Sequence, residues 1–393
     1  NLTPDKYYEL RLHTNVDGQM AQVTDDKSSV SNKATVLTKD NGADVEHTTE
    51  AKQDVDNTII QKVNTGYDQA THQVKWTITV NQNKLPITGS TVTDVFNTAD
   101  MTFLNVDAIR KDGMAFTLDK DNRTASKNGQ TIVWSADDNP VFTFKDQTND
   151  ESIYEIDVTT QLTETFINEY LTTNAENNVV NTAVLRGFVK GMPIRDSKDV
   201  SQTDNKVSDD ATAPIATTAL NKHGQYDSGT QIITWTAAFN GGQAAMKGRV
   251  ITEDLSANPI LELKHRDPKT GGLLTDPVKV YEGKWENGKI VKANDTPVIK
   301  DRSEFTDVAD QGFKFTVPDK YANTILIFEF DTYITNSASG ADVRNTIKLE
   351  PLSGVNKGEE DSSTADGLDY FDIDEYASIS VGPYIKVKKT SSS

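Results

Sequence analysis

The chain carries one phrase twice, and this internal repeat is the feature that most constrains its fold. The first copy, KVNTGYDQATHQVKWTITVN, begins at Lys62, and the second, KHGQYDSGTQIITWTAAFN, begins at Lys222. From Trp76 and Trp235 onward the two copies align without a gap, as WTITVNQNKLPITGSTVTDVF and WTAAFNGGQAAMKGRVITEDL. Self-similarity at a fixed period indicates structural units of one kind arranged in tandem.

Strand signals dominate both units. Short β-branched or aromatic runs such as VKWTITV, QTIVWSA, QIITWTAAF and TILIFEFDTYI are separated by turn clusters such as SKNGQ, NGG and ENGK. One short helix, TETFINEYL, is expected over residues 163–171. The pattern predicts an all-β protein built from tandem β-sandwiches with few helices.

The repeat also predicts where the units begin and end. Two complete sandwiches are expected over residues 58–215 and 216–385. Residues 1–57 match only the closing part of such a unit, and residues 386–393 resemble the opening strand of a further one. We therefore expect the chain to be a segment of a longer array of domains.

Composition narrows the possible partners. The formal net charge of −19 argues against nucleic acid and anionic membranes as partners. No stretch approaches the roughly 18 apolar residues that a membrane span needs.

Cysteine is absent, the five histidines are scattered, and no metal or cofactor motif occurs, so we expect no cofactor and no metal. A calcium-like alternation at Asp119, Asp121 and Asn122 is better explained as a hairpin turn.

A lysine, an acid and an asparagine recur in the same order in both units. The acid follows the lysine by 32 positions (94 − 62) in the first unit and by 31 (253 − 222) in the second, and the asparagine comes late in each. The sets are Lys62, Asp94 and Asn181 in the first unit, and Lys222, Glu253 and Asn345 in the second. In a sandwich, residues this far apart in sequence can meet in the core.

Strand alternation selects the acid in each unit. In VTDVF the parity of the strand puts Asp94 on the same face as Val92 and Phe96. In ITEDL the gapless alignment selects Glu253. Asp254 is the alternative if a bulge shifts the strand.

The ordered set of motifs resembles the isopeptide-bonded, immunoglobulin-like domains of Gram-positive cell-surface adhesins and pilins. It is most similar to collagen-adhesin-type domains with the DE-variant immunoglobulin fold. The motifs K…GYD…VKWTITVN…VTDVF…VVNTAVL and K…GQYD…ITWTAAFN…ITEDL…VRNTIKL carry the resemblance over both complete units. The resemblance implies that each lysine amine joins the asparagine amide of its own unit spontaneously, assisted by the neighbouring Asp or Glu.

The implied cross-links connect Lys62 with Asn181 and Lys222 with Asn345. They would close loops of 119 (181 − 62) and 123 (345 − 222) residues. Asn32 matches the cross-linking asparagine of the incomplete first unit. Lys389 matches the lysine of the incomplete last unit. We expect neither of these two to be linked within this chain.

The chemistry is reasonable on physical grounds. Burial lowers the pKa of a lysine and raises that of a carboxylic acid, so both groups tend toward their neutral forms. A neutral amine is a competent nucleophile, and a protonated carboxyl can donate to the amide and help ammonia depart. A buried ion pair between lysine and acid without a covalent bond is the alternative interpretation.

The function expected from the resemblance is structural. The chain is predicted to be a stalk segment of a bacterial cell-wall-anchored surface adhesin, cross-linking itself once and acting as no enzyme otherwise. The alternative is the ligand-binding region of an extracellular-matrix adhesin of the collagen type, with a trench between adjacent sandwiches. Expected partners are neighbouring domains of the same longer chain and, in the alternative, a host matrix protein. The expected location is the extracellular surface of a Gram-positive bacterium.

Overall fold

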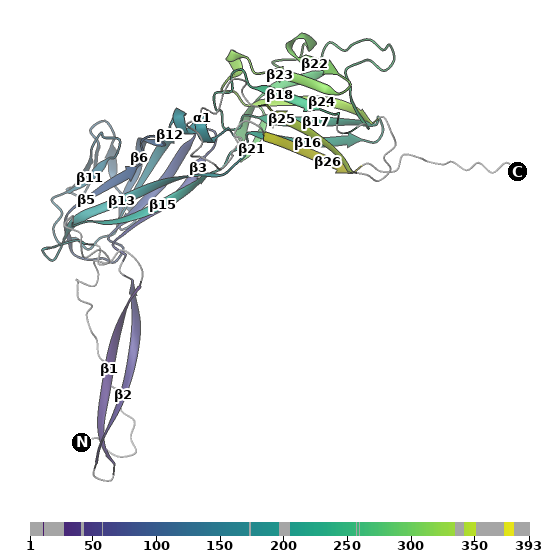
Figure 1. Cartoon of the computed structure of the whole chain (residues 1–393). Coiled ribbons are helices and arrows are strands. Elements are labelled where there is room, and N and C mark those ends of the chain that lie inside the picture. Colours follow the sequence, from purple (N-terminus) through teal and green to yellow (C-terminus); the bar gives the residue numbers. More distant parts are fainter. Residues whose placement is uncertain are drawn as a thin grey trace, which may run out of the picture. The chain divides into compact units, whose positions relative to one another are not determined.

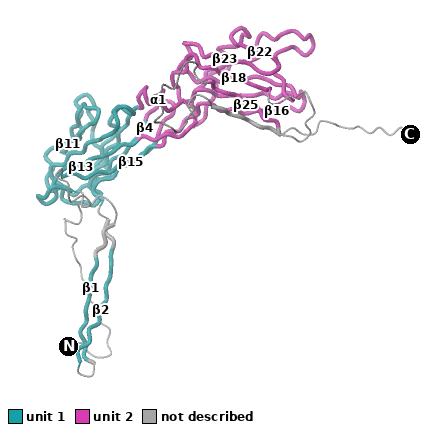
Figure 2. The backbone as a smooth tube through the Cα atoms, viewed as in Figure 1, with its two compact units in different colours: residues 1–66, 74–161, 180–213 teal, residues 67–73, 162–179, 214–393 magenta. Residues whose placement is uncertain are grey.

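A computed structural model of the chain describes residues 11, 27–40, 43–56, 58–172, 174–195, 205–256, 258, 260–334, 342–350 and 373–380. Most of these residues lie in strands (Figure 1), so the prediction of an all-β fold is confirmed. The chain divides into two compact units (Figure 2). Unit 1 comprises residues 1–66, 74–161 and 180–213, and unit 2 comprises residues 67–73, 162–179 and 214–393.

Unit 1 contains a sandwich of two sheets. The first has the order β14 (Met192–Pro193), β13 (Asn177–Val189), β5 (Ile87–Phe96), β11 (Val141–Lys145), β10 (Gln130–Trp134), β9 (Thr124–Lys127) and β8 (Thr117–Asp119), with β15 (Val207–Ile215) pairing β13. The second has the order β3 (Ile60–Asp68), β4 (Gln73–Val80), β12 (Tyr154–Leu162), β6 (Met101–Lys111) and β7 (Met114–Ala115). The rings of Phe144 and Tyr154 meet edge to face between the sheets, with centroids 4.8 Å apart.

Unit 2 contains a second sandwich. One sheet has the order β16 (Leu220–Asp227), β17 (Ile232–Phe239), β24 (Leu326–Ile334), β20 (Val278–Glu286) and β21 (Lys289–Lys292), with β19 (Leu261–Leu263) pairing β24. The other has the order β22 (Thr306–Ala309), β23 (Gly312–Thr316), β18 (Val250–Asp254), β25 (Asp342–Leu349) and β26 (Ile373–Ser380). The rings of Phe315 and Phe328 lie 5.4 Å apart across the two layers. Two short 3-10 helices, Arg302–Glu304 and Asp319–Tyr321, complete the unit.

The described part of residues 1–57 is a two-stranded hairpin of β1 (Lys27–Asp40) and β2 (Ala43–Asp56). Asn32 is exposed on this hairpin and faces Ala51. The expected opening strand at 386–393, with Lys389, lies outside the described residues. The proposed incomplete units at the two ends therefore stay predictions.

The repeated phrase occupies the same structural position in both units. In β4 and β17 every second side chain is buried, with Trp76 and Trp235 fully inside. This alternation follows from the period of two in a strand. After each strand comes a buried asparagine with positive φ, Asn81 at 63° and Asn240 at 61°. Asparagine tolerates this left-handed conformation better than most residues.

These two asparagines close the turn after the strand in the same way. The amide of Asn81 donates to the carbonyls of Leu85, Asp150 and Ser152 and accepts from the Leu85 N–H. Asn240 makes the equivalent set of bonds to residues 244, 322 and 324. The repeated asparagine is therefore a structural residue that satisfies buried main-chain groups.

The helix α1 (Glu164–Tyr170) forms where it was predicted. The Thr163 hydroxyl caps it by accepting from the Phe166 N–H at 3.1 Å. Although α1 follows β12 in the sequence, it belongs to unit 2. Ile167 packs against the core of that unit, and the Asn168 side chain accepts from the Ala245 N–H at 2.7 Å.

Asn174 ties the segment after α1 to the start of β16. Its Oδ1 accepts from the N–H groups of Ala219 and Leu220 at 2.8 and 3.1 Å, and its Nδ2 donates to the Leu220 carbonyl at 2.9 Å. We expect Asn174→Ala to lower the unfolding free energy of unit 2 by about 1 kcal/mol or more, because three hydrogen bonds are lost. Chemical denaturation measures the change.

The exposed neighbour Asn178 is the matched control. It makes no side-chain hydrogen bond within the described part of the chain, so Asn178→Ala should leave stability unchanged within about 0.5 kcal/mol. Equal effects of the two substitutions would contradict the role given to Asn174.

Candidate functional site

The first candidate site brings together Lys62, Asp94 and Asn181 in the core of unit 1. Lys62 lies on β3 in one sheet, whereas Asp94 and Asn181 lie on β5 and β13 in the other. The Lys62 ammonium donates to Asp94 Oδ1, and Asn181 Nδ2 lies 3.5 Å from Asp94 Oδ2. The side chains of Lys62 and Asp94 are fully buried. The buried Asn181 Oδ1 has no hydrogen-bond partner among the described residues.

The second candidate site repeats this arrangement in unit 2. Lys222 on β16 faces Glu253 on β18, and its Nζ lies 2.9 and 2.7 Å from the two carboxylate oxygens. Both of these side chains are fully buried. Asn345 on β25 is 2% exposed, and neither atom of its amide has a partner with hydrogen-bond geometry within the described part of the chain, although the amide lies close enough to Glu253 to lower the pKa of that acid. Because buried amides are nearly always bonded, this one needs an explanation.

The sheet register places the acid and the asparagine identically in the two sites. In unit 1 Ala183 is opposite Asp94, and Asn181 comes two residues before it. In unit 2 Ile347 is opposite Glu253, and Asn345 again comes two residues before. A separation of two residues keeps both side chains on the inner face. The acid and the asparagine therefore hold the same register in both sites, although one site uses Asp and the other Glu.

The structure also separates the two candidate acids of unit 2. Glu253 points into the core beside Lys222, whereas Asp254 is exposed. The Asp254 carboxylate accepts from the N–H of Ser256 at 2.9 Å, and hydrogen bonding by the Ser256 side chain and by this N–H holds the pKa of Asp254 below the usual value. Asp254 is thus on the outer face and does not contact Lys222, since no bulge shifts β18 at this point.

Burial changes the protonation of the site groups. Desolvation lowers the pKa of Lys62, although the Asp94 charge opposes the change. Desolvation likewise lowers the pKa of Lys222 to about 8, against the attraction of Glu253. The pKa of Glu253 is raised by desolvation, which Lys222 partly offsets. Both partners in unit 2 are therefore shifted toward their neutral forms.

Tryptophans lie against both lysines, a contact that was not predicted from the sequence. Lys62 Nζ is 5.6 Å from the centre of the Trp76 ring, and Lys222 Nζ is 5.1 Å from that of Trp235. The signal was present in the sequence, because the tryptophan follows the lysine at nearly the same distance in both copies of the repeat.

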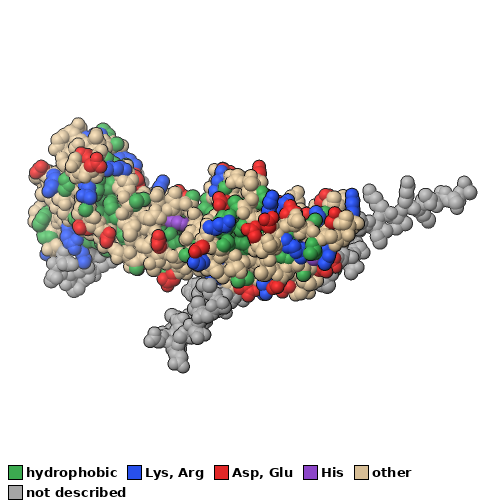
Figure 3. Space-filling view, turned by 90° about the horizontal axis from the view of Figure 1, so that it is seen from above, with side chains coloured by type: hydrophobic (Ala, Val, Ile, Leu, Met, Phe, Trp, Pro, Cys, Tyr) green, Lys and Arg blue, Asp and Glu red, His purple; other side chains and the backbone are tan. Residues whose placement is uncertain are grey.

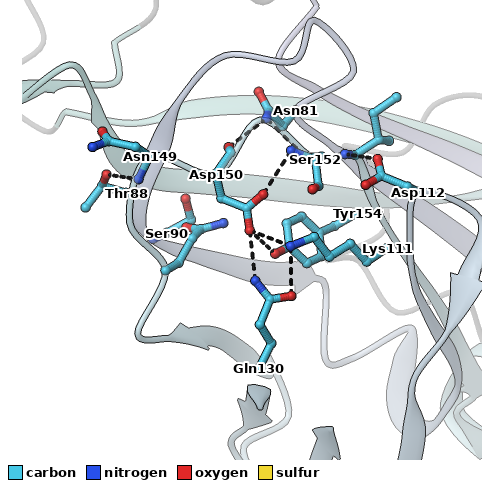
Figure 4. Close-up of polar contacts among 12 residues, drawn as sticks. Asn81, Thr88, Ser90, Lys111, Asp112, Gln130, Asn149, Asp150, Ser152 and Tyr154 are labelled. Carbon is cyan, nitrogen blue, oxygen red and sulfur yellow. Dashed lines mark hydrogen bonds and ion pairs between the residues drawn. The ribbon is translucent and has the colours of Figure 1, made fainter. Parts of the chain in front are cut away.

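Unit 1 holds a second group of lysine, acid and amide, which the sequence did not indicate (Figure 4). Lys111 Nζ donates to Asp150 Oδ2 at 2.9 Å and to Gln130 Oε1 at 2.8 Å, and Gln130 Nε2 donates to the same carboxylate oxygen at 3.0 Å. The hydroxyl of Tyr154 adds a bond of 2.6 Å to Asp150.

This group differs from the site in unit 2 in the protonation of its acid. The side chain of Lys111 is 22% exposed, and hydrogen bonds from Tyr154 and Lys111 hold the pKa of Asp150 well below its usual value despite partial desolvation. Its acid therefore stays ionised and cannot donate a proton. The group has the same three functional groups in contact, but its acid is not shifted toward the neutral form as Glu253 is.

Comparison with known proteins gives structural neighbours only. No protein-family model and no curated protein sequence matches the chain. The structural neighbours are collagen adhesins and pilins. They include the collagen-binding subdomain of the Enterococcus faecalis surface protein ACE, with 15% identity over 40% of this chain and 99% of that one and a TM-score of 0.24.

Two longer neighbours cover most of the chain. The collagen adhesin of Staphylococcus aureus has 9% identity over 82% of this chain and 91% of its own, with a TM-score of 0.25. BcpA, the major pilin subunit of Bacillus cereus, has 12% identity over 82% and 83%, with a TM-score of 0.28. The class defined here, a tandem β-sandwich protein with one buried lysine–acid–asparagine set in each sandwich, rests on the strands and contacts described above.

Proposed function

We propose that each sandwich forms an intramolecular amide bond between its buried lysine and asparagine. The observation that carries this proposal is the repeated placement of a buried lysine, a contacting acid and an underbonded asparagine amide at one register. A single buried ion pair could be a structural accident. Two equivalent sets, in units whose sequences differ at most positions, support a shared chemical role.

The bond would form by attack of the neutral lysine amine on the asparagine carbonyl carbon. In unit 1 the Lys62 Nζ–Asn181 Cγ bond forms and the Asn181 Cγ–Nδ2 bond breaks. One of the two Nζ protons stays on the new amide, and Asp94 transfers the other to the leaving nitrogen, which departs as ammonia. Asp94 ends the reaction in the protonation state in which it began, as a general acid and base should.

The orientation of the amide supports this assignment in unit 1. Asn181 Nδ2, the atom that leaves, is the amide atom that faces Asp94 Oδ2. The core holds the three reacting groups in contact, so the reaction does not depend on an unfavourable encounter of free side chains. This fixed geometry can supply a large part of the reduction in the activation barrier. Since the reaction is needed once in the life of the chain, a slow rate is sufficient.

A permanent ion pair explains the sites less well. Removing two charges from water costs several kcal/mol for each ion, and the attraction between them often fails to offset this cost. An amide that is buried without a partner costs about 1–3 kcal/mol more. Conversion to a neutral secondary amide removes the lysine charge and uses the asparagine.

The pH dependence of the reaction should be bell-shaped. In unit 2 the competent form of the Lys222–Glu253 pair holds one proton, with a neutral amine and a protonated acid. Above pH of about 8, the lowered pKa of Lys222, the pair loses that proton and the rate should fall. At low pH the amine becomes protonated and the rate should fall again.

Refolding experiments can measure this profile. Chains that have never folded, dissolved from insoluble protein in denaturant and checked for the full sequence mass, would be diluted into buffers of different pH, quenched with acid, and digested to quantify the branched peptide that contains Lys222 and Asn345. A rate that keeps rising above pH 9 would contradict the role of Glu253 as the acid. Glu253→Gln should abolish the branched peptide, whereas Asp254→Asn should leave its rate unchanged.

We infer a stalk segment of a bacterial surface adhesin or pilin as the biological role. The tandem arrangement of self-linked sandwiches supports it, because such domains resist unfolding without a metal, a cofactor or a disulfide. Among the described residues no helix is long and apolar enough to span a membrane. On the face shown in Figure 3, acidic and basic side chains are interspersed. An extracellular location on the cell wall is part of this proposal.

Ligand binding is the second candidate, and a groove in unit 2 favours it. The groove has a volume of about 300 Å³ and is lined by outward-facing residues of β16 and β17 and by residues of the hairpin of β20 and β21. Its lining includes Asn221, His223, Thr236, Trp285 and Ile290. Because several neighbours are collagen-binding proteins, a pull-down with collagen is the direct test, with Trp285→Ala as the variant expected to lose binding.

A further inference from the structure

Each tryptophan beside a reactive lysine is anchored by a threonine on the neighbouring strand. Trp76 Nε1 donates to Thr160 Oγ1 at 3.0 Å, and Trp235 Nε1 donates to Thr332 Oγ1 at 2.9 Å. Both threonines are fully buried. Within the described part of the chain neither indole N–H has another hydrogen-bond partner.

The anchored rings limit where the lysine amines can lie. In unit 2 Lys222 Nζ lies 5.1 Å from the ring centres of both Trp235 and Phe330, with the Glu253 carboxylate as its polar contact. A ring face attracts a cation and excludes water. The amine is thereby confined to a short path between the rings and the acid.

A glycine makes room for the anchored ring in unit 2. A Cβ atom added to Gly224, two residues after Lys222, would lie 2.5 Å from Cζ3 of Trp235. The ring therefore packs directly on the main chain of the lysine's own strand. A shift of the ring would carry the lysine strand or the amine with it.

We propose that Thr160 and Thr332 are positioning residues for the cross-linking reaction, each holding through its hydroxyl the indole ring that aims the lysine amine at the asparagine. This inference rests on the proposed amide bond and adds residues that the lysine–acid–asparagine set does not include. The threonines contact neither reacting atom, and they act through the tryptophan. A misplacement of about 1 Å can slow an oriented reaction by about a hundredfold.

The test compares Thr332→Val with Thr332→Ser in refolding time courses. Valine keeps the shape of threonine and removes the hydroxyl, whereas serine keeps the hydroxyl. Each reaction is quenched at set times, and peptide mapping separates the Lys222–Asn345 product from the Lys62–Asn181 product. Unit 1 therefore serves as an internal control in every sample, and tryptophan fluorescence reports that the variant has folded.

We expect Thr332→Val to slow cross-linking in unit 2 by about tenfold to a hundredfold and Thr332→Ser to restore most of the rate. Thr160→Val should slow unit 1 alone. If Thr332→Val prevents folding, Trp235→Phe, which keeps a ring and removes the N–H, should show the same slowing.

The outcomes separate this inference from the function on which it rests. Wild-type rates in folded Thr332→Val and Trp235→Phe would overturn the positioning role and leave the amide bond intact. The positioning role would also be overturned if Thr332→Val lowered the stability of unit 2 but left its cross-linking rate, measured well below the melting temperature, unchanged. A purely structural hydrogen bond would give that result. Absence of both branched peptides from the wild-type chain would overturn the amide bond and the positioning role together.

Discussion

Intact-mass measurement of the purified chain should give a value two ammonia molecules below the mass of its sequence. Each Lys–Asn bond releases one ammonia, so Lys62→Ala or Asn181→Ala should reduce this mass deficit to one ammonia molecule. The pair of substitutions Lys62→Ala and Lys222→Ala should remove it. The change is all or none at each site, which makes it the largest effect that the structure predicts.

Lys111→Ala is the matched control for this measurement. Lys111 also contacts an acid and a side-chain amide, but its acid stays ionised. The deficit should therefore stay at two ammonia molecules in this variant. A deficit of three in the wild type would show that contact alone is enough for reaction. The full sequence mass in the wild type would end the cross-linking proposal and leave two buried ion pairs.

Loss of one cross-link should destabilise its own unit by about 5 kcal/mol. By analogy with a disulfide, a bond that closes a loop of 119 residues lowers the conformational entropy of the unfolded chain, and this raises the unfolding free energy by about 5 kcal/mol. Asn181→Ala should therefore lower the unfolding free energy of unit 1 and leave the transition of unit 2 in place. Denaturant unfolding followed by the fluorescence of the buried tryptophans measures both transitions.

A double-mutant cycle separates the covalent bond from ordinary contact. Contacting residues usually couple by about 0.5–3 kcal/mol. If Lys62 and Asn181 are joined, either substitution removes the whole bond, so the coupling between Lys62→Met and Asn181→Ala should approach about 5 kcal/mol. A coupling below about 2 kcal/mol would indicate that the two side chains only pack together.

The strands and their inward faces could be predicted from the sequence, because they depend on local alternation. Asp94 is buried between Val92 and Phe96 as the parity of VTDVF requires. The gapless alignment likewise placed Glu253, rather than its neighbour Asp254, on the inner face. The sequence also indicated which lysine, acid and asparagine would meet, because the same order appeared twice.

Other features depend on contacts that no local pattern encodes. The packing of α1 within unit 2 required knowledge of where Ala245 and the core around Ile167 lie. The group around Asp150 joins Lys111, Gln130 and Tyr154 from three separate strands. The threonine partners of the tryptophans lie 84 and 97 residues further along the chain, beyond any periodic signal.

The positions of the cross-linked residues determine how much of the chain a pulling force could lengthen. Lys62 is the third residue of β3, and Asn181 is the fifth of β13. Once they are joined, the 119 residues of the ring are shielded from stretching. At about 3.3–3.6 Å for each extended residue, roughly 400 Å of contour would be withheld, and only the segments outside the ring could extend.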